Sequence, residues 1–234
     1  MKDGGELAAW YVPARNRAAV LLIHGSGGNR SSVADRARML ARHGYGVLAI
    51  DLPGNGESDG RSSGLGWTAQ PGIDAALGFL TNRPDVDPHR IAGFGVSLGG
   101  EVLLEATARN HRLSAVISDG AARATIGSDL NTTGGLAGKV QKAQMQVGMQ
   151  LIRAVSGTRP APPLEELVPR IAPRPALLIA SGHGAEVKAN RTYRDETGSH
   201  AQLWLIPEAA HTGGLKSRPA EYEQRTIAFL DEVI

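Results

Sequence analysis

Short apolar runs recur along the chain and are separated by segments with helical periodicity. Most of the runs contain few polar residues, as expected for strands that are buried on both faces of a sheet. We predict strands at 7–12, 18–23, 46–50, 90–94, 114–118, 176–180 and 202–206. Apolar strands that alternate with helices indicate a mostly parallel central sheet flanked by helices, which is the α/β class.

Apolar residues three or four positions apart predict helices between these strands. The predicted helices cover 31–42, 68–80, 98–109 and 136–155, and a last helix begins near Pro219. Pro219 suits a first helical turn, because the N–H group that proline lacks would have no partner there. The helix at 31–42 carries Arg36, Arg38 and Arg42, which we interpret as a solvated outer face.

The stretch from Gly120 to Pro175 interrupts the alternation. It contains glycine-rich segments, one helical pattern and a proline-rich end, but no strand pattern. A long insertion in a compact fold usually has a function. We therefore predict one domain over residues 1–234, in which residues 120–163 form a small helical cap.

Composition narrows the class of protein. The chain has 234 residues, no cysteine and a net charge of +2, which excludes a disulfide scaffold and a cysteine nucleophile. It has no dense stripe of Lys and Arg, so a nucleic-acid partner is not expected. The apolar runs are too short to span a bilayer, and the N-terminus lacks the apolar core of a signal peptide. We expect a soluble, cytoplasmic protein without a membrane partner, although an N-terminal extension would change this location; the oligomeric state stays open.

The sharpest motif is Gly95-Val96-Ser97-Leu98-Gly99. It directly follows a predicted strand and directly precedes a predicted helix, which is the setting of a nucleophile elbow. In such an elbow the serine occupies a strained turn, and side chains at the flanking Gly95 and Gly99 would collide with the strand and the helix. Ser97 is therefore the candidate nucleophile.

A second strand runs into the glycine-rich loop His24-Gly25-Ser26-Gly27-Gly28. A tetrahedral oxyanion needs two backbone N–H donors about 3 Å away. We expect these donors to be Leu98, directly after the nucleophile, and Ser26, with His24 and Gly25 as supporting residues. An ordinary turn between a strand and a helix would give the same pattern.

A general base is expected at the carboxyl edge of the sheet, where ligands bind in folds of this class. Of the histidines, only His183 and His211 follow late strands. His211 lies in a loop directly after the last strand, where it could reach the elbow and transfer a proton. It is therefore the candidate base.

With these motifs the chain resembles the α/β-hydrolase family. The loop at His24, the turn from Asp51 to Ser58, the elbow at Ser97 and the late His211 occur in the order and approximate spacing of that family. The resemblance implies a serine–acid–histidine triad, and it implies that Asp51 is structural. The family usually begins with one more strand before 7–12, so Met1 need not be a native start.

The resemblance does not decide the acid. The loop after 176–180 usually contains an aspartate, but here it reads Ser181-Gly182-His183-Gly184-Ala185-Glu186. Glu186 lies in that loop and is long enough to reach an imidazole. Asp119 ends the preceding strand, a position that some relatives use. Glu186 is the first candidate and Asp119 the alternative.

Together these residues predict a serine hydrolase that cleaves a small carboxylic ester, with no metal and no organic cofactor. Short acyl chains are expected, because the cap is small and only 4% of the residues are aromatic. A thioesterase, an amidase or a peptidase would use the same triad.

Three other classes of function fit the sequence less well. A dinucleotide-binding loop at Gly93-x-Gly95 fails at its third glycine, because position 98 is leucine. A zinc site formed by His183, His211 and Glu186 lacks the usual spacing of metal ligands. A non-catalytic binding protein of the same fold would not need the serine, the histidine and the oxyanion loop together.

Overall fold

The computed structural model describes residues 5–62, 65–123, 135–156 and 160–234. The strands are β1 (Ala9–Val12), β2 (Ala19–Ile23), β3 (Gly46–Ile50), β4 (Ile91–Val96), β5 (Ala115–Asp119), β6 (Ala176–Ser181) and β7 (Ala201–Ile206). The α-helices are α1 (Ala34–Arg42), α2 (Gln70–Thr81), α3 (Leu98–Arg109), α4 (Gly135–Ser156), α5 (Leu164–Leu167), α6 (Gly184–Thr197), α7 (Gly214–Ser217) and α8 (Pro219–Val233). Short 3₁₀ segments are η1 (Arg30–Val33), η2 (Val168–Arg170) and η3 (Gly198–His200).

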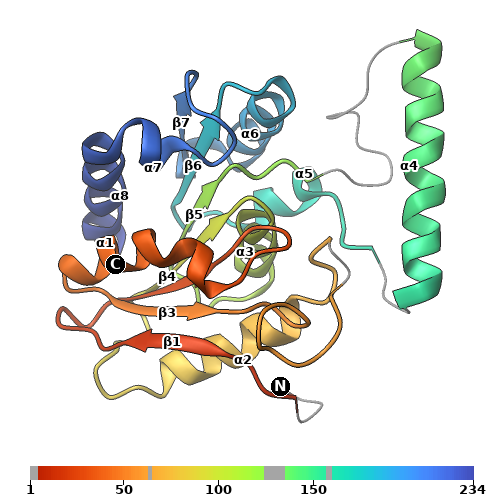
Figure 1. The fold of residues 1–234 in the computed structure, drawn as a ribbon. Coiled ribbons are helices and arrows are strands. Elements are labelled where there is room, and N and C mark those ends of the chain that lie inside the picture. Colours follow the sequence, from red (N-terminus) through yellow and green to blue (C-terminus); the bar gives the residue numbers. More distant parts are fainter. Residues whose placement is uncertain (1–4, 63–64, 124–134, 157–159) are drawn as a thin grey trace.

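All of the predicted strands are present and form one sheet in the order β1-β3-β2-β4-β5-β6-β7 (Figure 1). β1 pairs with β3 in the antiparallel direction, whereas the other neighbours are parallel. The prediction of a mostly parallel sheet flanked by helices is therefore confirmed. Because the strands after β1 run the same way, the loops that follow β2, β4, β5, β6 and β7 meet at one edge of the sheet.

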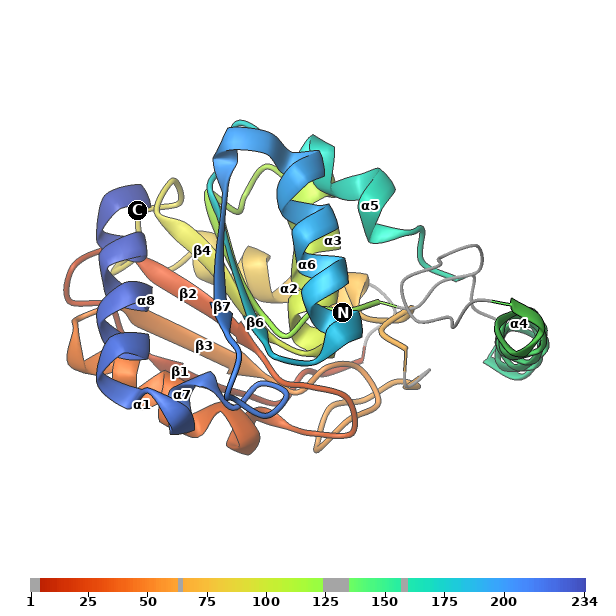
Figure 2. The ribbon, with the colours of Figure 1, turned by 90° about the horizontal axis from the view of Figure 1, so that it is seen from above.

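Each face of the sheet carries its own hydrophobic core. In β2, Leu21 and Ile23 belong to one cluster, and Val20 and Leu22 belong to the other. This is the alternation expected for a strand that is covered on both faces. Helices α2, α3, α5 and α6 contribute to the first cluster, whereas α1 and α8 contribute to the second. Figure 2 shows these two helical layers on opposite sides of the sheet.

Most predicted helices are present with shifted ends. The segment at 31–42 begins as η1 and continues as α1, and Gly44 follows it with a φ of 88°. Arg36 departs from the prediction of a solvated face, because it is buried. It lies three and four positions from Val33 and Leu40, which are both in the core, so it shares their face of the helix.

The sequence pattern missed helix α6. Its buried side chains include Glu186, Asn190 and Thr197 besides the apolar Ala189 and Tyr193. Helices are recognised by apolar residues three or four positions apart, and polar residues occupy several of these buried positions in α6. The segment therefore lacks the apolar pattern of a helix.

The helix predicted within the cap is present as α4. Figures 1 and 2 both show it apart from the sheet and its covering helices. Its Val147 and Leu151 are exposed. Other parts of the predicted cap, residues 124–134 and 157–159, lie outside the described residues. The role of residues 120–163 as a cap stays a prediction.

Within the described ranges, no helix is both long and apolar enough to cross a bilayer.

Candidate active site

Ser97 occupies a strained turn between β4 and α3. Its φ of 53° and ψ of −119° are outside the regions that L-residues usually adopt. A Cβ on Gly95 would lie 2.2 Å from the carbonyl carbon of Gly99, and one on Gly99 would lie 2.4 Å from the carbonyl oxygen of Ile23. Neither contact is possible, so the turn requires glycine at both positions. Strain of this kind is often found at functional sites.

The loop after β7 brings His211 to this serine. The Nε2 atom of His211 lies 2.9 Å from Oγ of Ser97, and its Nδ1 atom lies 2.6 Å from Oε2 of Glu186. A carboxylate can only accept, so Nδ1 carries the proton and Nε2 is left to accept from the serine hydroxyl. These three predicted residues therefore form one hydrogen-bonded chain, although 114 positions separate Ser97 from His211.

Glu186 is held by a residue that the sequence reasoning did not single out. Its Oε1 accepts from the backbone N–H of Ser181 at 2.5 Å, and its Oε2 accepts from the hydroxyl of Ser181 at 2.9 Å. Nδ1 of His183 lies 3.0 Å from the same hydroxyl. Glu186 is only 3% exposed, so these bonds fix the carboxylate in the first turn of α6.

These contacts shift the pKa values of the pair in opposite directions. Burial raises the pKa of Glu186, but the hydrogen bonds from His211 and Ser181 outweigh this effect, and the net pKa is lower than its ordinary value. The hydrogen bond to Glu186 raises the pKa of His211, burial opposes this, and the nearby carboxylates of Asp119 and Glu101 add to the rise. Both shifts favour an ionised carboxylate beside an imidazole of increased basicity.

Asp119, the alternative acid, has other partners. Its Oδ2 accepts from Nη2 of Arg36 at 2.7 Å and from the hydroxyl of Tyr222 at 2.6 Å. Among the described residues, its carboxylate is not hydrogen-bonded to His211. The structure therefore brings Glu186, and not Asp119, to the imidazole.

The predicted oxyanion donors, Leu98 and Ser26, both lie near the serine. Leu98 is the first residue of α3, where a backbone N–H has no partner within the helix. Gly25, next to Ser26, is close to the nucleophile, because a Cβ built on it would be 3.4 Å from Cβ of Ser97. Ser26 lines a pocket of about 320 Å³ together with Ser97 and His211. The pocket thus joins the serine, the imidazole and the glycine-rich loop.

His24 holds this loop in place. Its Nδ1 lies 2.7 Å from the carbonyl oxygen of Gly25, and its Nε2 accepts from the backbone N–H of Leu52 at 3.0 Å. Burial lowers the pKa of His24, which keeps the ring neutral. Asp51, next to Leu52, is fully buried and accepts from the backbone N–H of Arg30 at 2.6 Å. The hydrogen bonds of both side chains thus hold the loops at residues 24–30 and 51–57.

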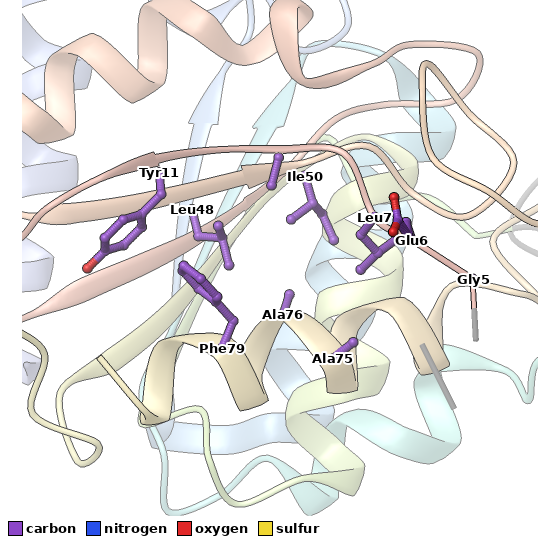
Figure 3. A pocket seen from close by; sticks show the side chains of 10 residues that line it. Gly5, Glu6, Leu7, Tyr11, Leu48, Ile50, Ala75, Ala76 and Phe79 are labelled. Carbon is purple, nitrogen blue, oxygen red and sulfur yellow. The ribbon is translucent and has the colours of Figure 1, made fainter. Parts of the chain in front are cut away.

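A larger pocket of about 520 Å³ lies elsewhere, between α2 and the strands β1 and β3 (Figure 3). Its walls are mainly apolar, with Leu48, Ile50 and Phe79 among them. The hydroxyl of Tyr11 in this pocket donates to Asp85 at 2.5 Å. The residues that line it include no nucleophile paired with a base. The larger pocket is therefore not the candidate active site.

Comparisons with known proteins identify the family and the fold of this chain. A family model described as serine aminopeptidase, S33 matches residues 14–156. The chain is 41% identical over 104 residues to an uncharacterized protein of Mycobacterium tuberculosis, a match that covers 43% of this chain and 36% of that protein. It is 26% identical over 242 residues to the uncharacterized protein YfhR of Escherichia coli K12, covering 98% of this chain and 78% of that protein.

Solved structures share the fold. The esterase Pf2001 of Pyrococcus furiosus superposes with a TM-score of 0.77 and 22% identity, over 99% of this chain and 88% of that one. Est1E of Butyrivibrio proteoclasticus, solved with ferulic acid bound, has a TM-score of 0.74 and 17% identity, over 99% and 96% of the two chains. With the family model covering more than half of its length, the chain belongs to the serine aminopeptidase S33-like family of α/β hydrolases.

Proposed function

We propose that this α/β hydrolase cleaves small carboxylic esters through an acyl-enzyme on Ser97, with His211 as the base and Glu186 as the acid of the triad. The observation that carries the proposal is the position of the imidazole, with Nε2 2.9 Å from Oγ of Ser97 and Nδ1 2.6 Å from Glu186. A base within hydrogen-bonding reach of the nucleophile, itself oriented by a third group, is the signature of an activated serine.

Acylation follows from this geometry. Oγ of Ser97 attacks the ester carbonyl carbon while Nε2 of His211 takes the hydroxyl proton. The N–H groups of Leu98 and Ser26 stabilise the oxyanion that forms. When the bond to the leaving alkoxide breaks, His211 returns the proton to it, and an alcohol departs. Glu186 holds the imidazole in the required tautomer and stabilises its positive charge.

Deacylation uses the same groups in the opposite direction. A water molecule gives a proton to His211, and its oxygen attacks the acyl carbon. The bond between that carbon and Oγ of Ser97 then breaks, and the proton returns to Oγ. One ester and one water give one carboxylic acid and one alcohol, and the serine is regenerated.

A second candidate function is hydrolysis of an aminoacyl amide. The description of the matching family as a serine aminopeptidase favours it. The same triad serves both reactions. For an amide, His211 must protonate the nitrogen before the C–N bond breaks, because an amide anion is a poorer leaving group than an alkoxide. The similarity to the structure described as the esterase Pf2001 is a similarity of fold, and it supports an ester substrate only to that extent.

The test is a panel of p-nitrophenyl esters and aminoacyl p-nitroanilides, assayed with the wild type and with Ser97→Ala. We expect the wild type to hydrolyse esters, Ser97→Ala to be inactive with an unchanged circular dichroism spectrum, and a fluorophosphonate to label Ser97. Faster turnover of the anilides would favour the second candidate. Equal activity of wild type and Ser97→Ala would exclude both.

A further inference from the structure

A second group of buried polar residues lies behind the His211 loop. Arg36 of α1, Asp119 at the end of β5 and Tyr222 of α8 are 8%, 2% and 0% exposed. Asp119 accepts from Arg36 and from Tyr222, and Nε of Arg36 donates to the hydroxyl of Tyr222 at 3.1 Å. Three elements that are distant in the sequence thus meet at one carboxylate. None of these contacts is used in the mechanism above.

This group is connected to the candidate base through the backbone. Nη2 of Arg36 donates to the carbonyl oxygen of Thr212 at 3.0 Å, and Thr212 directly follows His211. Thr212 has a φ of 57°, a conformation that non-glycine residues rarely adopt and that must be maintained by its surroundings. The bond from Arg36 therefore holds a loop residue in this rarely adopted conformation.

The same group is connected to the nucleophile. The backbone N–H of Ser97 donates to the carbonyl oxygen of Asp119 at 2.7 Å. Asp119 therefore bonds Ser97 through its main chain and, through Arg36, the loop that carries His211. Asp119 and its side-chain partners thus connect the nucleophile to the loop that carries the base.

The stability of the fold alone does not explain the buried Arg36–Asp119 ion pair. Burying an ion pair is costly, and an apolar replacement of similar shape is often equally stable or more stable. A buried Arg36–Asp119 pair in this position is better explained by the geometry that it enforces. The guanidinium can bond several acceptors in fixed directions, and here it holds Asp119, Tyr222 and Thr212 together.

We propose that Arg36, Asp119 and Tyr222 are positioning residues that set the distance between His211 and Ser97. The proposal rests on the proposed function, because it assigns these residues a role in the same proton transfer. A misplacement of about 1 Å can reduce a rate on the order of 10²-fold. The variants should therefore lose kcat much more than they change KM.

The test compares Arg36→Lys and Tyr222→Phe with Arg38→Lys as a matched control. Lysine keeps the charge but not the planar fork, so it cannot bond all three partners; Tyr222→Phe removes one hydroxyl and keeps the ring. Arg38 lies on the same helix, is exposed and pairs with Asp35. We expect kcat to fall about 10- to 100-fold for Arg36→Lys, less for Tyr222→Phe, and not at all for Arg38→Lys, with KM changed by less than about 3-fold.

Labelling of Ser97 by a fluorophosphonate separates this proposal from the proposed function. The labelling reaction requires His211 to activate Ser97, but it does not depend on which ester the protein cleaves. If wild type is not labelled, the proposed function fails. If wild type and both variants are labelled at the same rate, the function stands and the positioning role is wrong. If Arg36→Lys does not fold, Tyr222→Phe is the deciding variant. A normal melting temperature with slower labelling and a lower kcat supports the proposal. Labelling and turnover at the rates of the wild type overturn it.

Discussion

Gly120 lies directly against the imidazole of His211. A Cβ built on this glycine would be 3.0 Å from Cε1 of His211 and 2.7 Å from Cγ2 of Thr212. Gly120 also has a φ of 84°, which an L-residue with a side chain rarely adopts. The end of β5 therefore contributes the surface on which the base rests, and any side chain at position 120 would displace it.

Gly120→Ala is expected to lower kcat about 10-fold, because the added methyl group forces the imidazole of His211 and the side chain of Thr212 to shift from their present positions. The positive φ should also destabilise the fold, by more than about 1 kcal/mol. Gly198→Ala is the matched control, since Gly198 has a φ of 72° but nothing within 4 Å of an added Cβ. It should cost similar stability and leave kcat unchanged. Steady-state kinetics and thermal melting of both variants check this; equal kcat values for the two would contradict it.

The acid of the triad can be identified by two amide substitutions. Glu186→Gln is expected to lower kcat on the order of 10⁴-fold, because an amide at this position can select the wrong imidazole tautomer. Asp119→Asn should lower it less, since this carboxylate acts through Arg36 and Tyr222. The comparison needs kcat for both variants and a circular dichroism spectrum of each. A larger loss in Asp119→Asn, with its fold intact, would reverse the assignment.

The pH dependence should report on His211. Its neutral form accepts the serine proton, so kcat/KM is expected to rise with pH through the pKa of His211. The hydrogen bond to Glu186 raises that pKa, burial opposes the shift, and the charges of Glu186, Asp119 and Glu101 add to it. The increase of kcat/KM with pH should therefore be centred above 6.5, the ordinary pKa of histidine. In Glu186→Gln the residual activity should rise at lower pH, because the largest cause of the shift is lost. A rise at the same pH in both proteins would show that another group titrates.

A substitution at Ser181 should disturb the Glu186–His211 pair less than Glu186→Gln does. Ser181→Ala removes the hydroxyl bond to Glu186 and keeps the backbone bond to Oε1. We expect kcat to fall about 10-fold or less and the pKa of Glu186 to move back toward its ordinary value, because one of the hydrogen bonds that lower it is gone. Kinetics and the pH profile of the variant test this. A loss as large as that of Glu186→Gln would mean that the backbone bond alone cannot hold the carboxylate.

The fold could be predicted largely from the sequence, because strands buried on both faces leave uninterrupted apolar runs such as 19–23 and 91–96. Ser97 and His211 were identifiable because each follows a strand whose carboxyl end faces the same edge. Glu186 could be ranked above Asp119 only by its place in the loop after 176–180, since the distances to His211 are contained in no sequence pattern. Arg36 was missed because an arginine on a helix is normally solvated, although its spacing from Val33 and Leu40 placed it on the buried face.

The residues that line the pocket at Ser97 should determine the length of acyl chain that the protein accepts. That pocket has a volume of about 320 Å³, and its lining is mixed: Ser26, Ser32, Arg36 and Thr212 are polar, whereas Val33 and Val96 are apolar. A buried methylene gains about 0.8 kcal/mol only against an apolar wall, and polar groups deprived of water oppose the burial. The larger apolar pocket under α2 shares none of its lining residues with the pocket at Ser97.

We therefore expect kcat/KM to be highest for acyl chains of a few carbons and to fall with length, so that butyryl esters are cleaved faster than palmitoyl esters. The p-nitrophenyl series measures this with a constant leaving group. Detergent-free assays below the aggregation limit of each ester are needed, because micelles lower the free substrate concentration and imitate a preference for short chains. A kcat/KM that rises from butyryl to palmitoyl under these conditions would mean that an apolar acyl site adjoins Ser97, and the short-chain proposal would be wrong.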